Sequence, residues 1–328
     1  MVISVLSLGG TISMQPASQG AGLVPQLSAE SLVEGLTRTA RAVKARSLMT
    51  VASSALAWPD VFRLAEEIRN EVASGAKGIV VTQGTDTIEE VAFAIDLLVQ
   101  ADVPIVFTGA MRSPSLPGSD AKANLSDAIE VASSPQARGF GTLVVMAEQI
   151  HAARSVQKVH TTSYLAFASV NGGPLGYVRE GRTTLLYNPT RADLGTIRPT
   201  YSPALKPVAL VKLGLDDDGF LLDGLSAKVA SGLVVEGYGG GHVMPACVDK
   251  LERLRQEMPV IIAARPRGGS TLSKTYGFEG SEIDLLNRGF ITSGLLDALK
   301  ARVLLVVLLQ GEKTKSEIRG AFHVYGGS

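Results

Sequence analysis

The strongest constraint on the fold is an alternation of short apolar runs with amphipathic segments through the first half of the chain. Apolar, β-branched runs predict buried strands at residues 2–8, 78–84, 103–109 and 141–147. Apolar side chains recur at helical spacing in residues 60–75 and 87–100. Strands that alternate with helices favour a mostly parallel sheet flanked by helices, so the predicted fold class is α/β.

A break in this alternation separates a second unit. Residues 188–207 carry four prolines and no sustained period, which is typical of a linker. Because 328 residues are long for one domain, we expect an N-terminal α/β domain over residues 1–187 and a smaller C-terminal α/β domain over residues 208–328. Strands are predicted in the smaller domain at residues 208–213, 232–241, 260–265 and 301–309. A helix is predicted at residues 245–257.

Charge and cysteine content narrow the functional classes. Lys plus Arg and Asp plus Glu both total 31, and no basic run occurs, which argues against nucleic acid or an anionic membrane as a partner. Cys247 is the single cysteine, so no intrachain disulfide can form, as is typical of a reducing compartment. The N-terminus has no basic signal segment, and no apolar stretch nears the roughly 20 residues of a membrane helix. We expect a cytoplasmic protein.

Polar residues follow three of the predicted strands at the point where each strand ends. Thr11 follows two glycines, and Thr85 with Asp86 follows one. Ala110 follows the glycine that ends the next strand. The carboxyl ends of parallel strands are the ligand-binding edge of such a sheet, and a hydroxyl with a base beside it can act as a nucleophile. The sequence therefore predicts a catalytic site at this edge.

Each candidate also has a local structural explanation. A loop threonine more often bonds its own turn than a ligand. Thr87, with Glu90 three residues later, predicts a capping box at the helix start, so we assign Thr87 no chemistry. One helix needs one principal cap, which leaves Thr85 and Asp86 available. Lys158 lies among valines and is either a solvated loop lysine or, if partly buried, a base.

Other features predict no site of their own. The glycines of residues 237–242 lack the order of a phosphate-binding motif, and no G-x-S-x-G serine elbow occurs. The four histidines lack metal-ligand spacing, and Cys247 is expected to be buried. We expect neither a metal nor a cofactor.

These motifs together resemble the bacterial-type L-asparaginase family. "SLGGTIS" is similar to the family's first signature and "VVTQGTDTIEE" to its second. "TGAMRS", "ARSVQKVHTT", "SVNGGPLGYV" and "KARVLLVVLL" follow in the family's order, so the resemblance covers essentially the whole chain. It implies a homo-oligomeric amidohydrolase, a dimer or tetramer, that uses threonine nucleophiles. Its implied reaction converts L-asparagine to L-aspartate and ammonia, with glutamine as a side substrate.

The resemblance implies a role for each matching residue. Thr11 matches the first catalytic threonine, which attacks the side-chain amide carbon. Thr85, Asp86 and Lys158 match the triad of the second threonine, in which Asp86 also holds the substrate's α-amino group.

Three further positions imply substrate contacts. Ser53 matches the serine that binds the α-carboxylate. Ala110 matches the residue whose backbone carbonyl faces the departing amide. Glu282 matches an acidic residue that reaches into the neighbouring subunit's site.

Three positions depart from the family's pattern. Gly22 stands where a flexible loop carries a tyrosine that contacts the first threonine, and no tyrosine occurs nearby in the chain. Ser54 stands where a glutamine follows the substrate serine, and an asparagine of the second domain is replaced near Gly240. These departures predict a larger catalytic share for Thr85 and Lys158, and a weaker or shifted substrate preference.

Three alternatives stay open from the sequence. The same fold could hydrolyse glutamine or another small amide. A related fold serves as the ammonia-producing subunit of a tRNA-dependent amidotransferase, which usually has an extra N-terminal domain that we do not expect, since Thr11 lies so near Met1. The third alternative is a catalytically weak amino-acid-binding protein.

Overall fold

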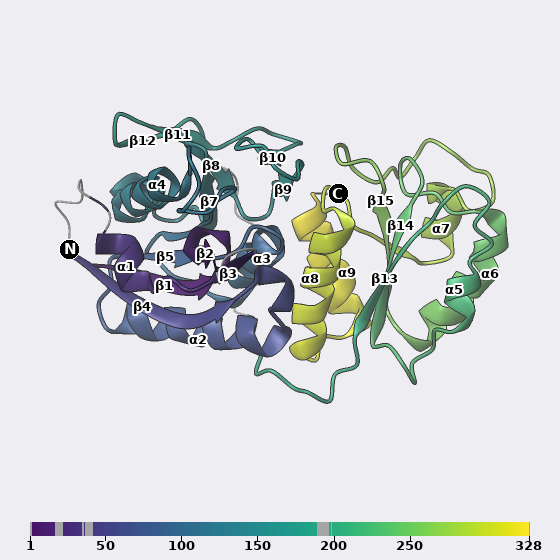
Figure 1. Ribbon diagram of the computed structural model, residues 1–328. Coiled ribbons are helices and arrows are strands. Elements are labelled where there is room, and N and C mark those ends of the chain that lie inside the picture. The colour runs from purple at the N-terminus through teal and green to yellow at the C-terminus, as the bar shows by residue number, and fades with distance from the viewer. Residues whose placement is uncertain are drawn as a thin grey trace. The chain divides into compact units, whose positions relative to one another are not determined.

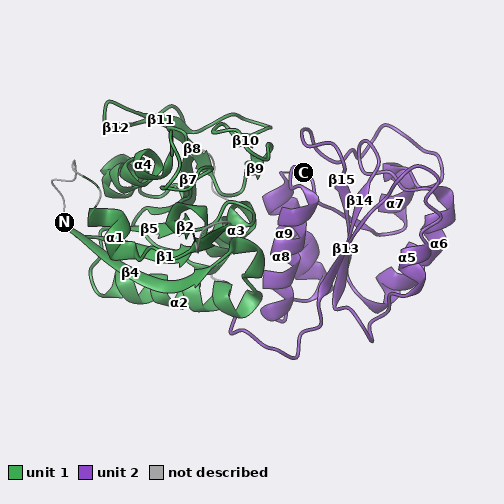
Figure 2. Ribbon diagram, viewed as in Figure 1, with its two compact units in different colours: residues 1–191 green, residues 192–328 purple. Residues whose placement is uncertain are grey.

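The computed structural model describes residues 2–16, 22–34, 36, 42–188, 197 and 199–327. The chain divides into two compact units, unit 1 over residues 1–191 and unit 2 over residues 192–328 (Figure 2). The linker predicted at residues 188–207 stays a prediction, because residues 189–196 and 198 lie outside the described part of the chain.

The described residues of unit 1 form an eight-stranded sheet (Figure 1). Its strands are β1 (Val2–Gly9), β4 (Ala42–Val51), β5 (Gly78–Thr82), β6 (Ile105–Thr108), β7 (Thr142–Met146), β8 (Gln149–Ala152), β11 (Gly176–Arg179) and β12 (Arg182–Leu185). Their order is β12-β11-β8-β7-β6-β5-β1-β4. The strands from β4 to β7 pair in parallel, whereas β8, β11 and β12 continue the sheet antiparallel. The carboxyl ends of β1, β5 and β6 therefore lie along one edge.

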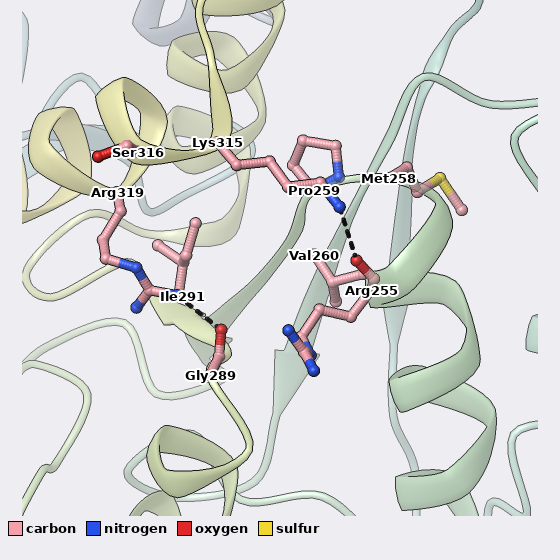
Figure 3. A pocket seen from close by; sticks show the side chains of 9 residues that line it. All are labelled: Arg255, Met258, Pro259, Val260, Gly289, Ile291, Lys315, Ser316 and Arg319. Atoms are coloured by element: carbon pink, nitrogen blue, oxygen red, sulfur yellow. Dashed lines mark hydrogen bonds between the residues drawn. The ribbon is translucent and has the colours of Figure 1, made fainter.

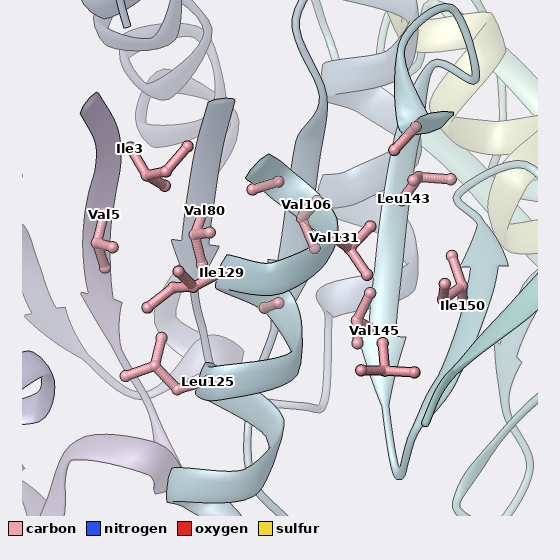
Figure 4. Packing of buried hydrophobic residues seen from close by; sticks show 14 of the residues in the cluster. Ile3, Val5, Val80, Val106, Leu125, Ile129, Val131, Leu143, Val145 and Ile150 are labelled. Atoms are coloured by element: carbon pink, nitrogen blue, oxygen red, sulfur yellow. The ribbon is translucent and has the colours of Figure 1, made fainter. Parts of the chain in front are cut away.

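Helices cover both faces of this sheet. They are α1 (Ala29–Glu34), α2 (Trp58–Ala73), α3 (Ile88–Leu98) and α4 (Ala121–Ser133). Leu125 and Ile129 of α4 pack on Val5, Val80 and Val106 of the central strands, all of them buried (Figure 4). Because the central strands are covered on both faces, their side chains are almost uniformly apolar. This packed core holds the ends of the strands in place.

Short elements surround the ends of the parallel strands in unit 1. They are η1 (Thr11–Ser13), β2 (Met14–Pro16), β3 (Leu23–Pro25), η2 (Ser53–Ala55), η3 (Pro135–Ala137), β9 (Val156–Lys158) and β10 (Phe167–Ser169). β2 pairs with β3, and β9 pairs with β10, both antiparallel.

Unit 2 contains a parallel sheet in the order β13-β14-β15-β16, where β13 is Val208–Lys212, β14 is Gly232–Gly237, β15 is Val260–Ala264 and β16 is Ile291–Thr292. Its helices are α5 (Phe220–Asp223), α6 (Pro245–Glu257), α7 (Glu282–Asn287), α8 (Ala298–Gln310) and α9 (Lys315–Gly326). Leu251 and Leu254 of α6 pack with Leu233 and Ile262 in the core of this unit. The predicted fold class, with a larger and a smaller α/β unit, is confirmed.

One predicted element is wrong. Residues 301–309 were expected to form a strand, but they lie inside α8, whose first turn is capped by the Asp297 carboxylate 2.9 Å from the backbone N–H of Lys300. Nearly every side chain of α8 is buried, so the segment is apolar on all sides and shows no helical period. None of the helices formed by the described residues combines the length and the hydropathy that a membrane span requires.

Candidate active site

Glycines at the ends of neighbouring parallel strands let three loops touch. A side chain at Gly10 would overlap the backbone of Gly84, and Gly10 also has a φ of 81°, which favours glycine. A Cβ atom at Gly109 would lie 2.6 Å from a carbonyl oxygen of the neighbouring loop. Because Thr11 and Thr85 directly follow Gly10 and Gly84, the fold brings both threonines to the same edge of the sheet, as predicted.

Thr85, Asp86 and Lys158 form one hydrogen-bonded cluster. The Nζ atom of Lys158 lies 2.9 Å from Oγ1 of Thr85 and 2.8 Å from Oδ1 of Asp86. Thr85 is 6% exposed and the Lys158 side chain 18% exposed, whereas the Asp86 side chain is 64% exposed. Lys158 is therefore not a solvated loop lysine: its amine contacts a buried hydroxyl on one side and a solvent-facing carboxylate on the other.

Helix α3 holds Lys158 in place through a residue that the sequence did not single out. The buried Glu89, in the first turn of α3, accepts a hydrogen bond at 3.1 Å from the backbone N–H of Lys158. Lys158 is the last residue of β9, which pairs with β10 rather than with the main sheet. A carboxylate reaching from α3 thus fixes the lysine beside the loop that precedes the same helix.

Ser53 joins the Thr85 loop to the short helix η2. Its Oγ accepts a hydrogen bond from the backbone N–H of Asp86 at 3.2 Å, and its carbonyl accepts one from Oγ1 of Thr87 at 3.0 Å. The Gln83 side chain donates to the same Thr87 hydroxyl at 3.0 Å. The predicted capping box is wrong, because Thr87 occupies the N-cap position of α3 without a side-chain cap and uses its hydroxyl to bind Ser53 instead.

Ala110 lies in the third loop and is fully buried. The Asp120 carboxylate accepts the backbone N–H of Met111 at 2.9 Å, and Asn124 donates to the carbonyl of Gly109 at 3.0 Å. Asp120 and Asn124 were not predicted, although their spacing of four places them on one face of the N-terminal part of α4. They fix the backbone of the loop that carries the Ala110 carbonyl.

Thr11 begins η1 and is half-buried. Its hydroxyl makes no hydrogen bond with any residue that the structure describes. Gly22 is exposed, and an added Cβ there would have no atom within 4 Å. Ser54 is exposed in η2, next to the buried Ser53. Thr11, the predicted first nucleophile, thus makes no side-chain hydrogen bond to any described residue. Gly22 has no side chain that could contact it.

Glu282 lies in unit 2 and is 1% exposed. Its carboxylate accepts backbone N–H groups of Thr275 at 2.8 Å and Tyr276 at 2.6 Å, and lies 2.9 Å from Nε2 of His242. Burial acts to raise the pKa of Glu282, but these N–H donors and the nearby His242 outweigh it and lower the pKa below its ordinary value. A contribution of Glu282 to a neighbouring subunit's site stays a prediction.

The described residues contain no group of three or more His, Cys, Asp or Glu side chains arranged to hold a metal ion. The edge of the sheet carries the hydroxyls of Thr11, Thr85 and Ser53, the Lys158 amine and the Asp86 carboxylate.

Comparison with known proteins places this arrangement in a family. The model of the asparaginase N-terminal domain matches residues 2–191, and that of the glutaminase/asparaginase C-terminal domain matches residues 207–322. The chain belongs to the asparaginase family. The two matches correspond closely to unit 1 and unit 2, and Thr85, Asp86 and Lys158 all lie within the first match.

Individual members of the asparaginase family are similar over nearly their whole length. The chain is 34% identical to a probable L-asparaginase of Deinococcus radiodurans, with 98% of this chain and 96% of that protein covered. It is 31% identical to an L-asparaginase of Bacillus licheniformis, with coverage of 95% and 96%. The crystal structure of a probable cytoplasmic L-asparaginase from Campylobacter jejuni superimposes with a TM-score of 0.87 at 28% identity, covering 98% of this chain and 99% of that one.

Proposed function

We propose that this protein hydrolyses L-asparagine to L-aspartate and ammonia through an acyl-enzyme formed on a threonine. The observation that carries the proposal is the contact of the Lys158 amine with both Thr85 and Asp86 at the edge where Thr11 also lies. The similarity to L-asparaginases over the full chain supports the same reaction.

Acylation begins at Thr11, whose hydroxyl is free of hydrogen bonds to the described residues. Its oxygen forms a bond to the amide carbon, the carbon–nitrogen bond then breaks, and ammonia leaves with the proton that Thr11 gave up. The Thr85–Lys158 pair carries that proton. An amine that accepts a proton becomes an ammonium ion, and the contact with Asp86 stabilises this charged state.

In deacylation, water hydrolyses the ester formed on Thr11. Thr85, with its oxygen 2.9 Å from the amine of Lys158, takes a proton from the water as its own proton moves to that amine. The hydroxide adds to the ester carbon, the bond to Thr11 breaks, and the Thr11 oxygen takes up the proton that the Lys158 amine had accepted. L-Aspartate leaves, and the site returns to its initial state.

Charge complementarity supports the proposed substrate contacts. The solvent-facing carboxylate of Asp86 suits an α-ammonium group. The Ser53 oxygen accepts a backbone N–H of the Asp86 loop, which leaves the Ser53 proton available to the α-carboxylate. The backbone carbonyl of Ala110 would accept an N–H of the departing amide.

Glutamine is proposed as a side substrate. Ser54 is short and exposed, so it restrains the substrate less than a longer side chain would. Ammonia release from asparagine and glutamine, measured side by side, gives the ratio of kcat/KM values that defines the preference.

The proposal extends to a homo-oligomer, a dimer or tetramer, located in the cytoplasm, in which Glu282 serves a neighbouring subunit. Light scattering tests the assembly. Complementation tests the shared site: Thr85→Val and Glu282→Ala subunits, each inactive alone, should regain part of the wild-type activity when co-assembled. Co-assembled subunits that stay inactive would exclude a site shared between subunits.

The reaction is tested with purified protein, asparagine and a coupled ammonia assay. Thr11→Val and Thr85→Val should each lower kcat by about 10³-fold without unfolding the chain. Thr184→Val is the matched control, since Thr184 is an exposed residue of β12 and loses the same hydroxyl. Full activity in either active-site variant, or no ammonia from the folded wild type, would overturn the proposal.

A further inference from the structure

Unit 2 contains a small cavity remote in sequence from the catalytic threonines. It has a volume of about 200 Å³ and lies between the C-terminal end of α6, the start of β15, the loop before β16 and the first turns of α9. Figure 3 shows the side chains of Arg255, Lys315 and Arg319 extending around Val260 and Ile291. The cavity thus combines apolar walls with three cationic groups contributed by two helices.

Two of the three cations are held in place by backbone carbonyls. Lys315 Nζ donates to the carbonyls of Arg255 and Gln256, each at 3.2 Å, at the C-terminal end of α6. Arg319 donates to the carbonyl of Gly289 at 2.7 Å and to that of Phe290 at 3.2 Å. An ammonium has three donors and a guanidinium five, so both groups retain donors for a ligand.

Arg255 is oriented by packing alone. Its guanidinium lies 5.7 Å from the ring centroid of Phe290, and its Nη1 would lie 3.4 Å from a Cβ added at Gly289. It has no hydrogen-bond acceptor among the described residues, and its buried Nε is without a partner there. Arg255 and Arg319 therefore flank the same residue, Gly289, with the donors of Arg255 unused.

The charge of this cluster is not balanced by the protein in the described part of the chain. None of the residues lining the cavity is acidic. The nearest acidic residues in the sequence have other partners: Glu252 binds Arg288, Glu257 binds the backbone of Ala227, and Glu317 binds Lys313. Three like charges around one cavity repel one another, and an anion between them would remove that repulsion.

We propose that this cavity is a binding site for a small oxyanion, a phosphate or carboxylate group held by Arg255, Lys315 and Arg319. Guanidinium groups bind such groups through two parallel hydrogen bonds, and the unused donors of Arg255 supply one such pair. The ligand is either a phosphoryl compound or a carboxylate, and this site is independent of the amide hydrolysis proposed for unit 1.

The full-length protein is titrated by calorimetry with inorganic phosphate and, separately, with succinate, at an ionic strength held constant with sodium chloride. We expect saturable binding of at least one anion to the wild type. Arg255→Met and Arg319→Met should each weaken it by about tenfold or more, since each removes charge-assisted hydrogen bonds. Methionine keeps an apolar stem, so the packing on Phe290 persists.

Arg253→Met is the matched control, because Arg253 lies on the same helix but outside the cavity. Phosphate binding alone identifies a phosphoryl ligand, succinate binding alone a carboxylate ligand, and both a general oxyanion site. The proposal is overturned if neither anion binds the wild type, or if the two cavity variants bind as tightly as Arg253→Met. Circular dichroism confirms that each variant is folded.

Discussion

The carboxylate of Glu89 accepts the backbone N–H of Lys158 at 3.1 Å, so a residue buried in helix α3 sets the position of the amine that contacts Thr85. This bond acts on the lysine's backbone and leaves its Nζ free for Thr85 and Asp86. Glu89 is therefore a positioning residue for the proposed reaction.

Two substitutions of Glu89 distinguish its hydrogen bond to the Lys158 backbone from the effect of its negative charge. Glu89→Ala removes the acceptor and should lower kcat by about tenfold or more, because small displacements of catalytic groups are costly. Glu89→Gln retains an acceptor oxygen and should restore most of the rate. Steady-state kinetics with asparagine gives both values. Equal losses in the two variants would show that the negative charge of Glu89, rather than its bond to Lys158, matters.

The contact between Gly10 and Gly84 predicts a large loss of stability in Gly10→Ala. The added Cβ would overlap the backbone of Gly84, in addition to the strain of a φ of 81°. Gly75→Ala is the matched control, since its φ is 95° and nothing lies within 4 Å of the added atom. We expect the control to lose about 1 kcal/mol of unfolding free energy, and Gly10→Ala to lose at least about 3 kcal/mol. Urea denaturation of both variants decides the comparison.

His151 predicts a loss of stability in mild acid. Burial lowers the pKa of His151 from 6.5 to about 4, and its Nδ1 lies 3.0 Å from the Ser169 hydroxyl. Below pH 6.5 the unfolded chain binds a proton that the folded chain refuses until about pH 4. The contribution of His151 to the free energy of unfolding is therefore complete above pH 6.5 and is lost between pH 6.5 and 4. Its magnitude is about 3 kcal/mol.

Denaturation of the wild type and of His151→Gln across that pH range tests this point. The variant starts from a lower stability, but the difference between the two proteins should shrink as the pH falls. A difference that stays constant from pH 7 to 4 would show that His151 takes up its proton equally in the folded and unfolded chains.

Asp127 predicts the opposite trend. Burial, then the charges of Glu148 and Glu130, raise the pKa of Asp127 from 3.8 to about 6. The folded chain keeps this proton while the unfolded chain loses it, so the stabilising contribution is present below pH 3.8 and lost as the pH rises to about 6. At pH 7, the Asp127→Asn variant should have a free energy of unfolding about 1 kcal/mol higher than that of the wild type, allowing for the partial exposure of Asp127.

Asp249→Asn is the control for Asp127→Asn, since it removes the same charge from an exposed position on α6. Thermal unfolding at pH 7 and pH 4 should show a gain for Asp127→Asn at pH 7 only. An equal gain in the control would attribute the effect to net charge.

The parts of unit 1 that the sequence predicted share one physical property. Strands β1, β5, β6 and β7 are buried on both faces, so uninterrupted apolar runs mark them, and glycines mark the ends of β1, β5 and β6. Thr85 and Asp86 could be predicted because they follow such an end directly. The valines around Lys158 and the family resemblance make it a candidate in the sequence. Its contact with Thr85 is visible only in the folded structure.

What the sequence did not predict depends on contacts between distant segments. β4 carries Lys44 and Arg46 and is buried only in part, so no apolar run identifies it. α8 is buried on all sides, so its sequence is apolar throughout and shows no helical period. Asp297, three residues before Lys300, is the one signal of a helix start there. Glu89 and Asn124 matter for the backbone groups they bind elsewhere, and no local pattern contains that information.

The pairing of Lys158 with Thr85 spans 73 positions of the chain. During synthesis, the loop that carries Thr85 leaves the ribosome well before the β9–β10 hairpin that carries the amine. A nascent chain that has folded only as far as α4 holds the hydroxyls of Thr11 and Thr85 but not the amine of Lys158, and the proposed reactive centre is incomplete until Phe167–Ser169 have emerged to pair with β9. The order of translation therefore makes the proposed nucleophiles available before the amine proposed as their base, which joins them only when most of unit 1 has been synthesised.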